Sequence, residues 1–212
     1  RRLCVIIAVY ALCRPQKEAG SLTTHPRRNS LNYVKAIRPW LRILIIGFLL
    51  FFCAQLALTI TGNLNFFPTI VLTGSFVIPV TFVAYFYEHV RHAEISLPLL
   101  TTSFIVGGAI GLIAAGLLEY QAMQNFNPGI LVSVGFIEES VKLIFPLAMY
   151  IGWRYRHEAD GLIFGIAAGM GFAALETMGY ALTSFVESRG DIIASQQVLL
   201  ARGFLSPAGH AA

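Results

Sequence analysis

The chain has 212 residues, of which 56% are hydrophobic and 12% are charged, and its formal net charge is +4. A composition this apolar excludes an ordinary soluble domain and indicates a membrane protein. The positive charge does not indicate nucleic-acid binding, because Lys and Arg collect at the ends of apolar runs rather than in one patch with interleaved aromatic residues. The three cysteines (Cys4, Cys13 and Cys53) show neither a disulfide framework nor metal-type spacing.

Residues 1–42 come before the first apolar run that is long enough to cross a bilayer. The stretch 3–13 is apolar but too short to span, and the sequence leaves open whether it is the tail of a preceding helix or a signal-like core. Residues 14–42 are polar and basic, which is typical of a flexible cytoplasmic segment. We expect 1–42 to form an N-terminal fragment followed by such a segment.

Apolar runs of about 20 residues, the length needed to cross a bilayer, predict the membrane-spanning helices in chain order. Five complete spans are expected, at 43–61, 66–87, 97–118, 129–151 and 160–184. Ser206 followed by Pro207 resembles a cap residue and a proline at the first helical position, and predicts the start of a sixth helix. We therefore expect an all-α, polytopic membrane domain over 43–212 that is truncated at its C-terminal end.

The positions of Lys and Arg between the spans predict which side of the membrane each loop faces. Seven basic residues lie in 14–42, one in the loop after the second span, and Arg154 and Arg156 in the loop after the fourth. The loops at 62–65 and 119–128 contain no Lys or Arg, and the last loop contains Arg189 and Arg202. The sequence therefore predicts that 14–42 and 152–159 are cytoplasmic and that 119–128 is external.

Four ionisable residues fall inside these spans at similar expected depths. Glu138 and Glu139 should lie roughly 14 Å below the outer face, and Glu176 roughly 12 Å below it, at about 1.5 Å per helical residue. His210 should lie about one turn into the sixth helix from the same face. Because an isolated carboxylate near the bilayer centre costs about 2.5–3.5 kcal/mol, we expect these side chains to share one cavity.

The residue types also indicate how this charge could be balanced. Lys142 is three residues from Glu139 and four from Glu138, so on a helix it can neutralise one of them. Glu176 and His210 are acceptable ligands for a divalent metal, which would offset the remaining charge. Adjacent helical residues point about 100° apart, so the two glutamates must have different roles.

Small residues at four-residue spacing predict close helix packing beside this region. Two such stripes occur, one at Gly161, Gly165, Gly169 and Ala173 and the other at Gly107, Gly111 and Ala115. Phe172 and Tyr180 flank Glu176 at one helical turn on each side, and we interpret both as core residues.

Three motifs in a fixed order resemble the PrsW family of intramembrane proteases. They are EESVK at 138–142, FAALETMGY at 172–180, and a histidine in the segment that follows; GSFVIPVTFVAYFYE at 74–88 is also similar to early helices of that family. The resemblance covers roughly 40–212 and implies a multi-helix membrane hydrolase, distantly similar to CAAX prenyl endopeptidases and bacteriocin-processing membrane proteins. The family motifs fall on Glu138, Glu139, Lys142, Phe172, Glu176, Tyr180 and His210.

The resemblance implies a membrane-embedded protease whose site is formed by Glu138, Glu139, Lys142, Glu176 and His210. We expect a divalent metal, with zinc as a candidate, on Glu139, Glu176 and His210, while the other glutamate takes a proton from water. A metal-free version in which a glutamate activates water directly stays open. The expected partners are a transmembrane protein substrate and the lipid bilayer, without nucleic acid, and the expected location is the bacterial cytoplasmic membrane.

Two other classes of function fit the same buried charges. A transporter or proton-relay protein would also place Glu, Lys and His near the membrane midplane, although an inverted repeat is not evident in the sequence. A non-catalytic scaffold could bind transmembrane partners through the same cavity. Cleavage of a transmembrane reporter by the purified protein would separate the protease from both.

Overall fold

The computed structural model describes residues 38–90, 95–124, 130–152 and 157–210. Within them the chain is helical and contains no strand. The expected segment 1–42 lies outside the described residues except for its last few positions.

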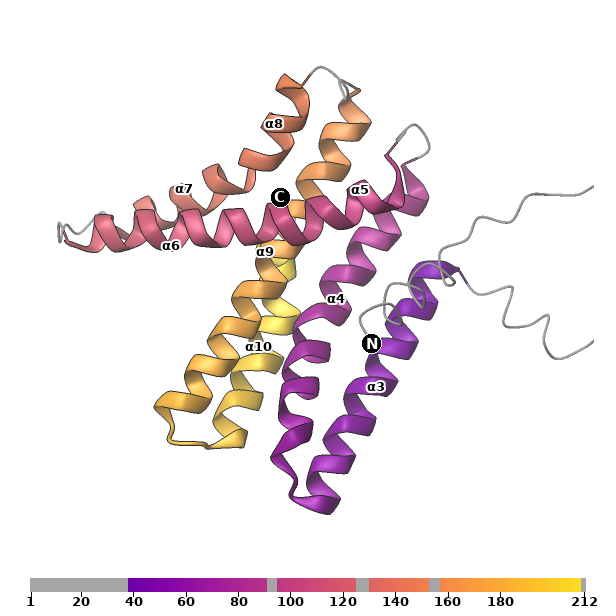
Figure 1. The fold of residues 1–212 in the computed structure, drawn as a ribbon, viewed down its shortest axis with the longest axis vertical. Helices are drawn as coiled ribbons and strands as arrows, with labels where there is room; N and C mark the ends of the chain where they lie inside the picture. Colours follow the sequence, from indigo (N-terminus) through magenta and orange to yellow (C-terminus); the bar gives the residue numbers. More distant parts are fainter. Residues whose placement is uncertain (1–37, 91–94, 125–129, 153–156, 211–212) are drawn as a thin grey trace, which may run out of the picture.

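The first two helices form a hairpin. Helix α3 (Pro39–Thr61) begins with proline at its first position and ends at Gly62, whose φ of 64° is the left-handed conformation that glycine adopts without strain. A short 3-10 turn (Leu64–Phe66) leads into α4 (Phe67–His89), and the two helices pack side by side (Figure 1). Both agree with the first two expected spans, within a few residues at each end.

The third span is a helix of changing pitch that lies across the others. It consists of α5 (Leu97–Thr102), a π-helical segment η2 (Ser103–Gly107) and α6 (Gly108–Gln124). Figure 1 shows α6 running across the directions of α4 and α9 rather than alongside them. The helix also continues six residues beyond the expected end at 118, so Glu119 belongs to the helix and not to a loop.

The fourth expected span, 129–151, is wrong as one continuous helix. The structure divides it into α7 (Ile130–Lys142) and α8 (Ile144–Ile151), with a turn at Leu143. Pro146 explains the division, because proline lacks an N–H group and its ring clashes with the carbonyl four residues earlier, at Lys142. The apolar run is long enough to span, but a single turn at Leu143 interrupts its helix.

Helix α9 (Glu158–Glu187) is the centre of the molecule. In the most apolar 18-residue stretch of α9, 72% of the residues are buried, compared with 17% in the corresponding stretch of α3. It contributes buried side chains to three apolar clusters, which pack it against α4 and α5, against α4 and α10, and against α6 and α7. Neighbouring helices therefore pack against α9 on several sides.

The last helix corrects two expectations. Helix α10 (Ile192–His210) forms a hairpin with α9, so the segment expected to be an outer loop is helical and Ser206-Pro207 does not begin a helix. Its polar residues are bonded to neighbouring helices: Ser195 Oγ donates to the carbonyl of Ala181 at 2.6 Å, and Gln196 Nε2 donates to Gln55 Oε1 at 3.1 Å. Such bonds allow a polar segment to lie inside a membrane bundle.

Four described segments are long and apolar enough to cross a membrane: Pro39–Thr61, Leu64–His89, Leu97–Gln124 and Glu158–Glu187. The expected count of five complete spans and the start of a sixth is therefore not what the described residues give. The broken α7–α8 segment and α10, which contains Gln196, Gln197 and Arg202, account for the difference.

Where the third span crosses α9, the backbones of the two helices are in direct contact. A Cβ atom added to Gly171 would fall on the carbonyl oxygen of Phe104, and one added to Gly108 would lie 2.7 Å from the backbone nitrogen of Phe172. Ser103 Oγ donates to the carbonyl of Phe164 at 3.2 Å beside this crossing. The π-helical segment thus lies at the point where α9 is approached most closely.

The two predicted stripes of small residues have different outcomes. Gly107 and Gly111 face neighbours, since Cβ atoms there would lie 3.0 Å from Ala168 and 3.2 Å from the ring of Phe172. Cβ atoms at Gly161 and Gly165 would meet no atom within 4 Å. Gly169 and Ala173 of the same stripe are buried, as predicted, whereas the prediction for Gly161 and Gly165 is wrong. Ala168 and Gly171 also belong to the packing face on α9.

Candidate functional site

The two adjacent glutamates of α7 have different surroundings, as their 100° separation predicts. Glu139 accepts a hydrogen bond from the ammonium of Lys142 at 2.5 Å, and its side chain is 51% exposed. Lys142 is 6% exposed, and its ammonium lies 5.2 Å from the ring centroid of Phe172 on α9. Lys142 therefore balances Glu139, while Glu138 is half-buried on a different face of α7.

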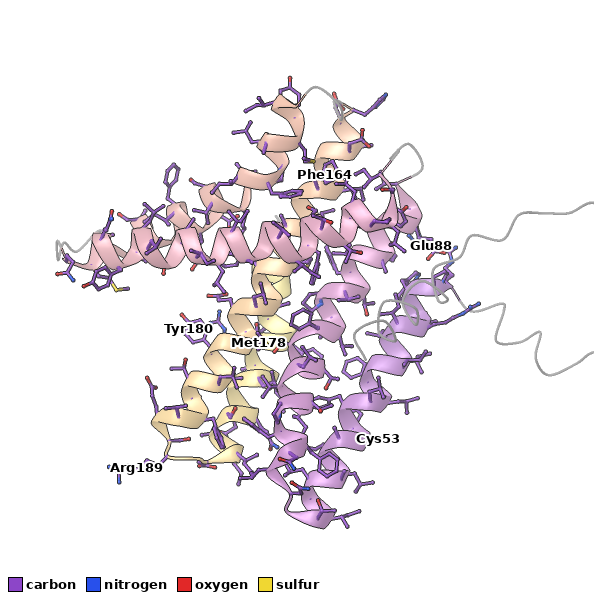
Figure 2. All side chains as sticks on the ribbon, in the orientation of Figure 1. Cys53, Glu88, Phe164, Met178, Tyr180 and Arg189 are labelled. Atoms are coloured by element: carbon purple, nitrogen blue, oxygen red, sulfur yellow. The ribbon has the colours of Figure 1, made fainter. Side chains whose placement is uncertain are left out.

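Glu176 on α9 is held by a cation that the sequence analysis left in a loop. Its Oε2 atom lies 2.7 Å from Nη2 of Arg202 on α10, and its side chain is 11% exposed. The guanidinium carbon of Arg202 lies 3.9 Å from the ring centroid of Tyr180. Figure 2 shows Tyr180 on the side of α9 that faces away from α4.

The two aromatic residues of the FAALETMGY motif thus each carry a cation, which packing alone did not predict. Phe172 lies beneath Lys142, and Tyr180 lies beneath Arg202. A ring face attracts a cation through its quadrupole, more strongly where water is excluded. Phe172 is also buried in the core, as expected, whereas Tyr180 is 50% exposed.

Glu119 on α6 is a fourth carboxylate of this region, and it was not among the residues expected from the sequence. It lies close enough to Glu138 and Glu176 for their charges to act on it, so acidic groups from α6, α7 and α9 come together. The expected span ended at 118, which placed Glu119 in a loop. A sequence-based prediction that extended this helix to Gln124 would have placed Glu119 inside it.

His210 is positioned differently from the expectation. It is the last residue of α10 rather than a residue in the first turn of a new helix. Along α10 it lies eight residues beyond Arg202, or about 12 Å along the helix axis. Its side chain is outside the described residues, so its part in a shared site stays a prediction.

Comparison with protein families supplies the identification. The family model described as PrsW family intramembrane metalloprotease matches residues 96–212, which is more than half of the chain. The chain belongs to the PrsW family. No curated protein and no solved structure shows significant similarity. Membership indicates a membrane protease that acts in the lipid environment on membrane proteins, and the four apolar segments agree with an integral membrane protein.

The description of the PrsW family as metalloproteases implies a divalent metal, for which the carboxylates of the site are acceptable ligand types. Glu138 and Glu176, from two other helices, act on Glu119 by like-charge repulsion, which a divalent cation would offset. Within the described ranges, no three His, Cys, Asp or Glu side chains are grouped closely enough to hold an ion as they stand. Coordination would therefore require these side chains to turn toward one another.

Proposed function

We propose that the protein is an intramembrane endopeptidase that hydrolyses a peptide bond in a transmembrane or membrane-adjacent segment of another protein. The observation that supports this most is that Glu138 and Glu176, from the two PrsW motifs, each lie close enough to Glu119 for their charges to act on it. A cluster of carboxylates at membrane depth is expensive, so its presence favours a chemical role.

Glu138 is the general base of the proposed reaction. It accepts a proton from water while the water oxygen bonds to the carbonyl carbon, and it then donates that proton to the amine nitrogen as the C–N bond breaks. Glu138 is preferred to Glu139 because Lys142 already holds Glu139. The Glu139–Lys142 pair fixes α7 against Phe172 and thereby orients Glu138.

Glu176 and His210 are the proposed metal-binding residues, with Glu119 in place of Glu139 as the further carboxylate. The change follows from position, because Glu119 lies close enough to Glu176 for their charges to interact. A bound divalent metal would lower the pKa of a coordinated water toward about 7 and polarise the scissile carbonyl. The identity of the metal, with zinc as the candidate, is part of the proposal.

The test is cleavage of a transmembrane reporter by the full-length protein purified in detergent, with the metal content measured on the same sample. Glu138→Gln keeps the size of the side chain and should reduce the rate by about 10²–10⁴. Glu187→Gln, at the exposed end of α9, is the matched control and should cleave like the wild type.

The outcomes separate the alternatives. A wild-type protein that binds the reporter without cleaving it would support a scaffold, and a Glu138→Gln protein that cleaves at the wild-type rate would remove Glu138 as the base. Uptake of ions into vesicles without cleavage would support a transporter.

A further inference from the structure

Arg202 joins α10 to the centre of the site through two contacts at once. The edge of its guanidinium reaches Glu176 at 2.7 Å, and its face lies 3.9 Å from the ring of Tyr180. We infer that Arg202 is the positioning residue for Glu176 and that Tyr180 holds Arg202 in place. This inference rests on the proposed function, since it gives Glu176 a catalytic use.

The geometry explains why three residue types occur together. Tyr180 follows Glu176 by four residues, so both lie on one face of α9, one turn apart. A planar guanidinium can stack on the ring while one of its nitrogens stays beside the carboxylate, whereas an ammonium offers a point charge without a flat face. Stacking on Tyr180 therefore places the positive charge of Arg202 at a defined position beside Glu176.

The surroundings of Glu176 explain why a nearby positive charge is needed to hold its side chain. The charges of Glu119 and Glu176 repel each other, and Glu176 is 11% exposed, so solvent screens its charge weakly. Arg202 is 31% exposed and supplies a positive charge from a separate helix. Without Arg202, repulsion would move the Glu176 side chain away from Glu119. Glu176 would then no longer be held in its catalytic position.

Lys142 offers a parallel on the other side of Glu176. It pairs with Glu139 and lies over Phe172, as Arg202 pairs with Glu176 and lies over Tyr180. In the PrsW motif on α9, an aromatic ring that contacts a cation therefore lies on each side of Glu176: Phe172 before it and Tyr180 after it.

The experiment compares three variants of the full-length protein: Arg202→Gln, Arg202→Lys and Arg189→Gln. Arg189 lies in the exposed turn between α9 and α10, far from Tyr180 in Figure 2, and serves as the control for loss of one positive charge. For each protein we would measure kcat and KM on the reporter, the affinity for Zn²⁺ by calorimetric titration, and the temperature of unfolding.

A positioning role predicts that Arg202→Gln lowers kcat at least tenfold with KM nearly unchanged, and weakens Zn²⁺ binding by about 10–100-fold, as for other residues that orient a ligand. Arg202→Lys should fall between this variant and the wild type, because it keeps the charge without the stacking. Arg189→Gln should match the wild type in all three measurements.

Several results would overturn the inference. If Arg202→Gln unfolds at a lower temperature but its folded fraction keeps kcat and Zn²⁺ affinity, the ion pair is only structural. If its Zn²⁺ affinity rises, Arg202 competes with the metal for Glu176. If the wild type cleaves without taking up Zn²⁺, kcat alone decides, and an unchanged kcat in Arg202→Gln refutes the role. A wild type that cleaves nothing refutes the proposed function itself, and the inference falls with it.

Discussion

Substitution of Gly171 by alanine should weaken the packing of the third span against α9 and destabilise the protein. The added Cβ would fall on the carbonyl oxygen of Phe104, and backbone cannot move aside as the end of a flexible side chain can. Inserting a methyl group into a packed contact typically costs about 1–3 kcal/mol. For a chain of this length, we expect the unfolding temperature to fall by about 2–12 °C. Cleavage should also fall, because η2 leads into α6, which carries Glu119.

Gly165→Ala is the matched control on the same helix. A Cβ atom at this position meets nothing within 4 Å, and alanine is a better helix former than glycine by up to about 1 kcal/mol. The assay is thermal unfolding of both full-length variants in one detergent, followed by reporter cleavage. Equal unfolding temperatures for the two variants, or a Gly171→Ala protein as stable as the wild type, would refute the reasoning.

Glu139→Gln should cost on the order of 3 kcal/mol in unfolding experiments because it removes the ion-pair partner of a buried ammonium, whereas Lys142→Met should cost less than about 1 kcal/mol because the remaining carboxylate is half exposed. Equal losses would contradict this asymmetry. Glu119→Gln should lower cleavage at least tenfold while leaving the unfolding temperature unchanged or higher, since it relieves like-charge repulsion; a normal rate would exclude Glu119 as a ligand. In a background without native cysteines, Asn125→Cys should react with an impermeant thiol reagent in intact cells and His157→Cys only after permeabilisation, and the reverse pattern would invert the predicted topology.

Hydropathy correctly predicted the helices in which the whole apolar run forms one continuous helix. The bounds of α3, α4 and α9 lie within a few residues of the expected spans, because each run contains enough apolar residues and is not broken by its own backbone. Pro79 within α4 did not end that helix, whereas Pro146 coincides with the division of the fourth run. Apolar length alone cannot distinguish these two prolines, since neighbouring helices decide whether a break is tolerated.

The site was predictable in its residue types more than in its contacts. The cost of buried charge selected Glu138, Glu139, Lys142 and Glu176, and the spacing correctly allowed Lys142 to neutralise one glutamate. Arg202 was missed because the polar residues of α10 lowered its hydropathy below that of a span. Their hydrogen bonds to α3 and α9 are tertiary contacts that no local pattern reveals.

The central position of α9 has a consequence for biogenesis. Helices α3 and α4 can pack on each other as soon as both are synthesised, and so can α6 and α7. All three apolar clusters, however, contain residues of α9, which is made later. During synthesis, Glu119 and Glu138 therefore enter the membrane before Glu176, and Glu176 before Arg202. The newly inserted chain must tolerate unbalanced carboxylates until the final hairpin arrives, and we expect this interval to be when membrane quality-control proteases recognise it most readily.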